Sequence, residues 1–583
     1  MSALRRLLPY LARYRTRYVG GAACMLLATA MALAIPWTVK SAVDTLERDG
    51  VAAHIGPHVL LILGLAAAHG AARLVSRFAV LGAAQWVEHD IRRDLYARLL
   101  TLPPAFYHRH RTGDLMSRVA NDIGTLRALS GFGFVMLVGT ALVFAGTLAA
   151  MWSIDPWLTL FAMAPFPALV VIAKRFNHDV DARSTAVQAQ LGLLSAKVQE
   201  NLTGMAVVRA YTMMDREIAG FGRLNREYQA RNLALARTQA VSWPLMGLIS
   251  GLGALIVLWL GGKAVVDGRM TLGSFVAFNG YLAQLAWPTI ALGWTLASIQ
   301  RGLAAMQRVI EVLDSSSTPL IAERDSPGRI DDRLPEGAIE FRDLTFTYDA
   351  RGPVLRDVSF AVPAGAVVAI VGPTGSGKST LGALLVRLYE PPRGTVFVAG
   401  RDVRDLPAGR LRRSVGYVPQ ESFLFSRPLR DNVRLADEHA DGRRLEDVAR
   451  TAGLADDLAG LPAGWDTVVG ERGLTLSGGQ RQRVALARAL VADPPYLVLD
   501  DVLASVDAAK EWEITRALRS AASGRTTVLM THRLKAAAEA DAIVVLDEGR
   551  VVEQGRHPDL LAAGGLYARL WRVQQLEDEL ANA

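Results

Sequence analysis

The chain has 583 residues, which is too long for one hydrophobic core, so several domains are expected. Hydrophobic residues make up 51% of it and the mean hydropathy is +0.22, yet 21% of the residues are charged. A membrane part joined to a water-soluble part gives such an average, whereas a uniformly soluble protein rarely does. The net charge of +8 comes from arginines spread along the chain, which favours contact with a lipid bilayer over nucleic acid. The single cysteine, Cys24, excludes an intrachain disulfide and a metal cluster built from thiolates.

The N-terminal region predicts a membrane-surface helix followed by a first membrane span. Residues 2–16 alternate apolar and basic positions, as in an amphipathic helix lying on the inner membrane surface, and no removable signal peptide is expected. The stretch from Tyr18 to about Val39 is uncharged and long enough to cross a bilayer. Three acidic residues then follow, which we expect in an external loop: Asp44, Glu47 and Asp49.

The second predicted span begins near His58 and carries His69, Arg73 and Arg77. Ionisable side chains at membrane depth usually face a bundle interior or a water-filled cavity. We therefore expect His69 and Arg73 to line a cavity. The alternative is that the membrane ends earlier and that these side chains reach the interface by snorkelling.

Further spans are predicted at about 131–154, 157–176, 241–265 and 271–296, which gives six in total. An even number of crossings returns the chain to the cytoplasm, so the polar tract 177–238 and everything after about residue 297 lie on that side. The sequence thus predicts an all-α, six-helix transmembrane domain over residues 1–312. Residues 313–336 are rich in Ser, Pro and Asp and predict a linker.

From residue 337 to 583 the pattern alternates strands and helices, as in an α/β domain with a phosphate-binding loop. The apolar run 366–370 predicts a strand, and residues 381–385 predict a helix. Between them, Gly-x4-Gly-Lys-Ser spacing predicts a cradle of backbone N–H groups for a nucleotide triphosphate. Lys378 is then placed to reach the β- and γ-phosphates, and Ser379 to ligate Mg²⁺. The cradle residues are Gly372, Pro373, Thr374, Gly375, Ser376, Gly377, Lys378, Ser379 and Thr380.

Four further side chains are predicted to meet at the nucleotide because each follows or precedes a strand. Asp500 ends the apolar run 496–500 and is suited to hold Mg²⁺ through water. Gln420 is placed to orient water or the metal, and His532 to reach a γ-phosphate. Tyr348 precedes the cradle and is suited to stack on adenine. Each of these residues taken alone is more often structural than functional.

A second anion-binding motif lies in the same domain. The pentapeptide 476–480, Leu-Ser-Gly-Gly-Gln, opens a predicted helix, so its N–H groups face outward at a helix N-terminus. The residues that present this second phosphate-binding surface are Ser477, Gly478, Gly479 and Gln480.

In this order, these motifs resemble the ATP-binding cassette (ABC) family. Over about 337–570 the chain has the family's motifs in the family's order: the cradle, Gln420, the signature pentapeptide, the Asp-terminated strand, Ser505-Val506-Asp507 and His532. Six spans before one cassette resemble a half-transporter of the multidrug and lipid exporter type. The resemblance implies ATP and Mg²⁺ as cofactors. It also implies a dimer, because each ATP is held between one subunit's cradle and the other's signature. The stretches near 112–123 and 212–222 match the positions of the family's coupling helices.

One position departs from the family pattern. The strand normally ends Asp-Glu, and the Glu polarises the attacking water, whereas this chain has Asp501, which is one methylene shorter. Help from a general base is typically worth roughly 10²–10⁴-fold. The chain's own ATP site is therefore expected to bind well and to turn over slowly. The resemblance then implies a heterodimer with a second half-transporter that has an intact Glu, and the alternative is a homodimer with two slow sites.

Taken together, the sequence predicts a multi-pass protein of the cell (inner) membrane with its ATP-binding domain in the cytoplasm. Its expected function is ATP-driven export of an apolar or small amphipathic substrate, such as a drug, lipid or peptide, with Asp501, His532 and Gln420 as catalytic residues. The alternatives are a regulatory or sensory membrane ATPase, and an importer built on the exporter fold. No nucleic acid partner is expected.

Overall fold

The computed structural model describes residues 2–50, 54–315, 333–348, 352–470, 476–502, 522 and 524–582. It divides into two compact units. The first comprises Met1–Leu100 and Thr112–Ser315, and the second comprises Thr101–Arg111 and Ser316–Ala583. The boundary between the two units at Ser315 and Ser316 lies inside the predicted linker, 313–336. Most of that linker falls outside the described residues.

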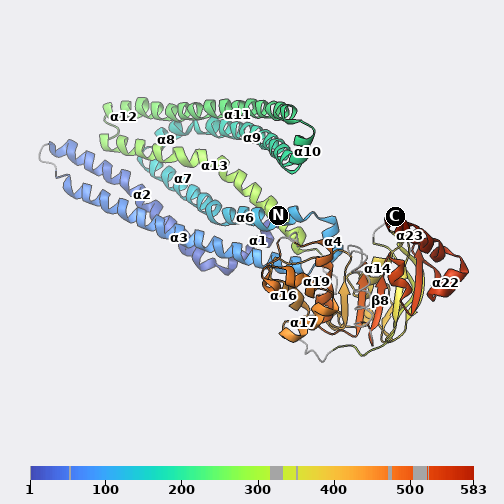
Figure 1. The fold of residues 1–583 in the computed structure, drawn as a ribbon. Helices are drawn as coiled ribbons and strands as arrows, with labels where there is room; N and C mark the ends of the chain where they lie inside the picture. The colour runs from blue at the N-terminus through green and yellow to red at the C-terminus, as the bar shows by residue number, and fades with distance from the viewer. Residues whose placement is uncertain are drawn as a thin grey trace. The chain divides into compact units, whose positions relative to one another are not determined.

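The regular structure described in the first unit is helical (Figure 1). Its elements are α1 (Ser2–Arg13), α2 (Arg15–Asp49), α3 (Gly56–Leu100), α5 (Thr112–Ser117), η2 (Arg118–Asp122), α6 (Ile123–Ala128), η3 (Leu129–Gly133), α7 (Phe134–Ile154), α8 (Pro156–Met163), α9 (Phe166–Thr203), α10 (Met205–Ala210), α11 (Met214–Ile256), η4 (Val257–Gly261), α12 (Gly262–Val266) and α13 (Leu272–Leu313). Helix α8 begins where the Asp155 side chain accepts the N–H of Leu158, and Thr271 caps α13 in the same way.

Three helices are long and apolar enough to cross a membrane: Arg15–Asp49, Gly56–Leu100 and the continuous stretch Thr112–Ile154. They coincide with the first three predicted spans. A shorter apolar helix covers Gly251–Val266 and overlaps the predicted fifth span. The fourth and sixth predicted spans fall on α8–α9 and on α13, so the count of six crossings stays a prediction.

One expectation about a loop is wrong. Asp44, Glu47 and Asp49 lie in the last turns of α2 instead of a loop, and Asp44 Oδ1 accepts the N–H of Gly273 at 3.1 Å, so its carboxylate caps the start of α13. The predicted coupling positions, 112–123 and 212–222, stay predictions, and both stretches are mainly helical. The first opens the long helix Thr112–Ile154, and the second spans a turn and the start of α11.

The short helices lie just before these stretches, at α4 (Pro104–Arg109) and α10. Proline supplies the local cause for α4, because Pro103 precedes it and Pro104 occupies its first turn, where the missing N–H costs nothing. For α10 the cause is Gly204, which ends α9, followed after the helix by Thr212 in the left-handed region (φ 54°).

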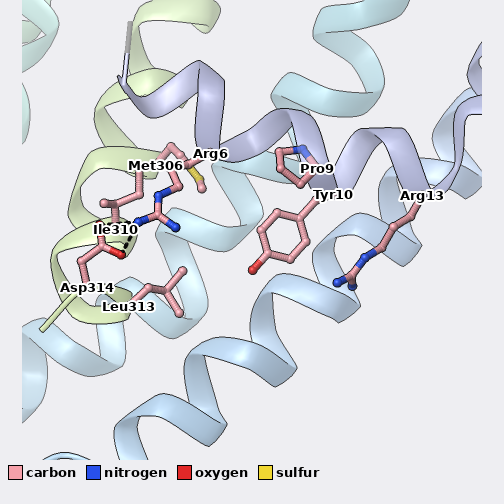
Figure 2. Close-up of a pocket in the computed structure, with 8 residues that line it drawn as sticks. All are labelled: Arg6, Pro9, Tyr10, Arg13, Met306, Ile310, Leu313 and Asp314. Atoms are coloured by element: carbon pink, nitrogen blue, oxygen red, sulfur yellow. Dashed lines mark hydrogen bonds and ion pairs between the residues drawn. The ribbon is translucent and has the colours of Figure 1, made fainter. Parts of the chain in front are cut away.

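The predicted amphipathic N-terminal helix is confirmed as α1, and its polar face is tied to neighbouring helices. Figure 2 shows Arg6 reaching Asp314 at the end of α13, with two N–O distances of 2.8 and 3.0 Å. Arg13 donates to Asp90 at 3.0 Å, on α3. A small cavity of about 210 Å³ lies between α1 and the last turns of α13. Helix α1 therefore joins α3 to the segment that leads into the linker.

The second unit contains α4 and the elements from residue 339 onward (Figure 1). They are β1 (Ile339–Phe346), β2 (Leu355–Val362), β3 (Val367–Val371), α14 (Lys378–Leu385), β4 (Val396–Val398), β5 (Arg401–Asp402), η6 (Val403–Asp405), α15 (Ala408–Ser414), β6 (Val415–Val418), α16 (Leu429–Val433), η7 (Arg434–Ala436), α17 (Gly442–Thr451), α18 (Ala455–Gly460), η8 (Gly464–Asp466), α19 (Gly478–Val491), β7 (Tyr496–Asp500), β8 (Thr526–Met530), α21 (Leu534–Ala538), β9 (Ala542–Asp547), β10 (Arg550–Gly555), α22 (His557–Ala563) and α23 (Leu566–Asn582).

These strands form two sheets. A four-stranded antiparallel sheet has the order β2-β1-β4-β5, and a six-stranded sheet has the order β10-β9-β3-β8-β7-β6. In the larger sheet β9, β3, β8, β7 and β6 are parallel and only β10 is antiparallel. A parallel sheet is covered on both faces, which is why β7 and β8 are buried along their whole length and are mostly apolar. In β3, Val368 and Ile370 pack with α14, whereas Ala369 and Val371 pack with α21.

Candidate functional site

The predicted nucleotide-binding residues follow adjacent parallel strands of the six-stranded sheet. The cradle follows β3, His532 follows β8, and Asp500 ends β7, and β8 lies between the other two. The carboxyl ends of parallel strands meet at one edge of a sheet, where ligands of such folds bind. The register Val368↔Val528 and Val498↔Val528 aligns the three strands. The fold thus brings together residues that are more than 150 positions apart in sequence.

The cradle closes tightly against the neighbouring strand β9. Gly372 has φ 151°, and a Cβ built on it would lie 2.0 Å from the carbonyl oxygen of Leu546. Gly377 has φ 101°, and its Cβ would lie 2.7 Å from Leu355 Cδ2. Gly372 therefore requires glycine for the backbone angle and for the space, whereas Gly377 requires it for the backbone angle. The loop leads into α14, whose N-terminus adds the positive end of its dipole.

Lys378 folds back over the cradle. Its Nζ donates to the carbonyl oxygens of Gly372 at 2.8 Å and Pro373 at 2.9 Å. Burial lowers the pKa of this ammonium, although the negative charges of Asp501 and Asp500 oppose the shift. A phosphate would offer a charged acceptor in place of neutral carbonyls, so the amine is held ready beside the site.

Ser379 and Asp500 lie together, as the metal prediction requires. Ser379 Oγ donates to Asp500 Oδ1 at 3.1 Å, and Asp500 is buried. Burial raises the pKa of the Asp500 carboxyl, the neighbouring charge of Asp501 adds to the rise, and the hydrogen bond from Ser379 opposes it. A buried carboxylate beside a hydroxyl is an oxygen donor set of the kind that Mg²⁺ prefers.

The two catalytic candidates Asp501 and His532 are in direct contact. His532 Nδ1 lies 2.7 Å from Asp501 Oδ1. Asp501 follows β7 with φ 51°, and its N–H donates to the Met530 carbonyl at 2.8 Å. A left-handed backbone is tolerated by Asp better than by most residues. The turn therefore aims the Asp501 carboxylate at the residue that follows the neighbouring strand.

Tyr348 belongs to an aromatic series beside the cradle. Its hydroxyl donates to Thr380 Oγ1 at 3.0 Å, and its ring lies edge-on to Tyr389, with centroids 4.8 Å apart. The His108 ring of α4 stacks on the Tyr389 ring, with centroids 6.5 Å apart and planes at 17°. Tyr348 is thus fixed at both ends, and α4 is linked to it through Tyr389.

The signature residues form the N-terminus of α19. Ser477 Oγ accepts the N–H of Gln480 at 3.2 Å, and Gln480 Oε1 accepts the N–H of Ser477 at 2.9 Å, which is a capping box. Asp457 on α18 holds this end by accepting from Gln480 Nε2 at 3.4 Å and from Arg483 Nε at 2.6 Å. None of these bonds reaches the described residues of the chain's own cradle.

Two sequence predictions are not supported by contacts at this site. Gln420 is exposed after β6 and makes no hydrogen bond with a residue that the structure describes, so its role in orienting water or metal stays a prediction. The motif Ser505-Val506-Asp507 lies outside the described residues.

Sequence reasoning missed one residue that joins the signature helix to the catalytic turn. Gln482 is 7% exposed, and its Nε2 donates to the backbone carbonyl of Asp501 at 3.4 Å. A signal for it was available, because a polar residue on an otherwise apolar helix face is expected to have a buried partner. Sequence reasoning also missed Tyr389, whose ring contact with Tyr348 depends on the folded domain.

Comparison with known proteins agrees with this geometry. Residues 19–289 match the ABC transporter transmembrane region, and residues 355–504 match the ABC transporter family model. A probable multidrug resistance ABC transporter ATP-binding/permease protein of Bacillus subtilis, YheI, is 34% identical over 99% of this chain and 98% of its own length. An ATP-dependent lipid A-core flippase of Syntrophus aciditrophicus is 33% identical over 100% of this chain and 96% of its own length.

Among solved structures, a bacterial Atm1-family ABC exporter with ATP bound matches with a TM-score of 0.79 and 30% identity, over 96% of this chain and 99% of that one. The matched regions are a helical transmembrane domain and a cytoplasmic ATP-binding domain that couples ATP hydrolysis to transport. The chain therefore belongs to the ABC transporter family and has the exporter fold.

Proposed function

We propose that the chain is one half of a dimeric exporter that uses ATP and Mg²⁺ to move an apolar or amphipathic substrate out of the cell. The observation that carries the proposal is the separation of two phosphate-binding surfaces within one domain. Cradle residues form hydrogen bonds with one another and with Asp500. The polar side chains of the signature form hydrogen bonds within the signature and with Asp457. A second subunit is then needed to supply the signature opposite this cradle.

The residues of the site take roles that follow from their positions. The cradle N–H groups and Lys378 hold the phosphates, and Tyr348 stacks on the adenine. Ser379 and Asp500 are the side chains that would hold Mg²⁺, which would neutralise negative charge on the phosphates. His532 contacts the γ-phosphate, and Asp501 accepts a proton from the attacking water. ATP binding closes the paired cassettes, and hydrolysis reopens them.

We propose further that this chain's own ATP site is the slow one of a heterodimer. Asp501 is a methylene shorter than the usual Glu, and its Oδ1 is already occupied by His532 at 2.7 Å. A carboxylate drawn back toward the strand holds the attacking water poorly, and small losses of alignment are costly in catalysis. The intact signature at Ser477 to Gln480 supports a partner whose own strand ends Asp-Glu.

Vectorial transport tests the proposed export. Inside-out membrane vesicles containing the chain and a candidate partner are given ATP and a fluorescent amphipathic substrate. ATP-dependent accumulation of the substrate inside the vesicles is expected. No accumulation is expected when Lys378→Ala is made in this chain and the corresponding lysine is replaced in the partner chain. Substrate leaving vesicles that face the same way indicates an importer. ATP hydrolysis without movement of any substrate tested indicates a sensory ATPase.

A further inference from the structure

A cavity in the transmembrane unit is lined by one basic helix face and three uncharged ones. It has a volume of about 390 Å³ and lies among α2, α3, α7 and α13. Such a volume is within the range of small-molecule sites. His69 and Arg73 line it, which confirms the expectation that they face a cavity, and Arg77 lines it as well. The three residues are spaced four apart on α3, so they share one face of that helix.

The packing of α2 against α3 sets the depth of this basic face. His69 Nδ1 lies 2.8 Å from the carbonyl oxygen of Ala28, which is ten residues after Tyr18 at the cytoplasmic start of the first span. Ten residues of helix rise about 15 Å, or half of a hydrocarbon core of about 30 Å. Arg73 and Arg77 are one and two turns closer to the cytoplasm. The cations therefore occupy the inner half of the membrane.

The two arginines have no counter-ion among the described residues. Neither guanidinium has a hydrogen bond or an ion pair with any residue that the structure describes. None of the residues lining the cavity is acidic. The lining helices also carry no Asp or Glu over 18–39, 56–87, 134–154 and 272–300. Charged side chains at membrane depth are costly, and an anion in the cavity would lower that cost by pairing with the two guanidinium groups.

The opposite walls of the cavity suit hydrocarbon. Val135, Met136 and Val143 line it from α7, and Met25 lines it from α2. Methionine side chains adapt to apolar groups of varied shape. A ligand that satisfies both walls has an acidic group at one end and an apolar chain at the other.

We propose that the exported substrate is an amphipathic anion, whose phosphate, sulfonate or carboxylate group is bound by Arg73 and Arg77 and whose apolar part lies against α2 and α7. This inference rests on the proposed export function and narrows its substrate class. Arginine suits the role because its planar guanidinium binds two oxygens of such a group at once. A cationic amphipath of the same size meets two like charges and is rejected.

Binding is measured separately from transport. The chain in phosphatidylcholine nanodiscs receives trace amounts of two photoactivatable lipids with identical acyl chains, one with a phosphate monoester headgroup and one with phosphocholine. Labelling of peptides from α2, α3, α7 and α13 is quantified after illumination. The phosphate lipid is expected to label these peptides at least tenfold more than the phosphocholine lipid. Arg73→Gln with Arg77→Gln is expected to remove that preference.

A matched control tests whether any membrane-proximal arginine attracts the anion. Arg15→Gln with Arg17→Gln removes two exposed arginines from the start of α2, outside the cavity, and is expected to leave the preference unchanged. If the glutamine pair at 73 and 77 does not fold, Arg73→Lys with Arg77→Lys keeps the charge but not the paired donors and is expected to reduce the preference.

The sources of the anion are distinguished by competition. If octyl phosphate displaces the phosphate lipid at concentrations where inorganic phosphate has no effect, the substrate is a soluble amphipathic anion. If octyl phosphate does not displace the phosphate lipid and labelling still depends on the headgroup, the substrate is a membrane lipid. Equal labelling by both headgroups, equal loss in the Arg15/Arg17 control, or displacement by inorganic phosphate alone overturns the proposal. Selective labelling without ATP-dependent movement in vesicles would instead overturn the export function and leave the anion site standing.

Discussion

His532 Nδ1 lies 2.7 Å from Asp501 Oδ1, so the switch histidine and the residue in the catalytic-base position are bound to each other. In a site built to activate water, the base must have an oxygen directed at the water. Here the short side chain, on a left-handed backbone at φ 51°, reaches His532. This contact is a physical reason to expect slow hydrolysis at this chain's own ATP site.

Lengthening this side chain should speed hydrolysis. We expect Asp501→Glu to raise the ATPase rate of the purified chain in lipid by an order of magnitude or more, because the carboxylate then extends past His532 toward the γ-phosphate. Lys378→Ala supplies the background, and Asp501→Asn, which removes the proton acceptor, should lower the rate toward that background. Brisk hydrolysis by wild type would mean that Asp501 is an adequate base, and a homodimer would then account for the chain better.

Asp500 provides a pH-dependent prediction. Burial is the main cause that raises its pKa in the folded protein above the usual 3.8, so the folded state binds this proton more tightly than the unfolded state does. The ionised carboxylate therefore costs folding free energy at neutral pH, and the cost disappears as pH falls from the folded pKa to below 3.8. Asp500→Asn should raise the unfolding temperature of the nucleotide-free protein at pH 7.5, by about 2–4 °C for each kcal/mol gained.

The gain from Asp500→Asn should shrink steadily as the pH of the unfolding measurement is lowered toward 4. The exposed carboxylate Asp456 provides the control, since Asp456→Asn should change the unfolding temperature little at either pH. Mg²⁺ with ATP should stabilise wild type more than Asp500→Asn, because the variant has lost an oxygen ligand. An unfolding temperature at pH 7.5 that is equal to or below that of wild type would contradict the account of burial.

The steric limits of the cradle are tested by a pair of alanine variants. Gly372→Ala should abolish ATP binding, because its Cβ would lie 2.0 Å from the Leu546 carbonyl oxygen and the loop must move. Gly394→Ala also places alanine at a positive φ of 75°, but with nothing within 4 Å. It should cost about 1–2 kcal/mol of stability and leave ATP binding intact. Equal loss of ATP binding in both variants, measured by titration with a fluorescent ATP analogue, would show that backbone strain and not contact decides the effect.

The sequence pattern predicted those structural features that depend on residues close together in the chain. The strand, loop and helix around Lys378 follow from glycine spacing and an apolar run, and the capped start of α19 follows from Ser477 and Gln480 three residues apart. Contacts that depend on tertiary packing were not predicted. Tyr389 lies beside Tyr348 because helix α14 and the strands close on one another, and no period in the sequence encodes that approach. Likewise the contact between Asp44 on α2 and the N–H of Gly273 at the start of α13 joins residues 229 positions apart, which no local pattern encodes.

The aromatic series predicts that Tyr389 supports base binding from behind Tyr348. Its ring meets Tyr348 edge-on at 4.8 Å, a geometry worth about 0.5–1.5 kcal/mol beyond burial, so Tyr389→Leu should weaken ATP binding by about twofold to tenfold. Tyr389→Phe keeps the ring and should bind ATP as wild type does. His108→Ala removes the ring stacked at 6.5 Å on the far side of Tyr389, and should leave the affinity for ATP within about twofold of wild type. Isothermal titration of the chain in nanodiscs gives these affinities. A loss in Tyr389→Phe as large as that in Tyr389→Leu would mean that the hydroxyl, and not the ring, positions Tyr348.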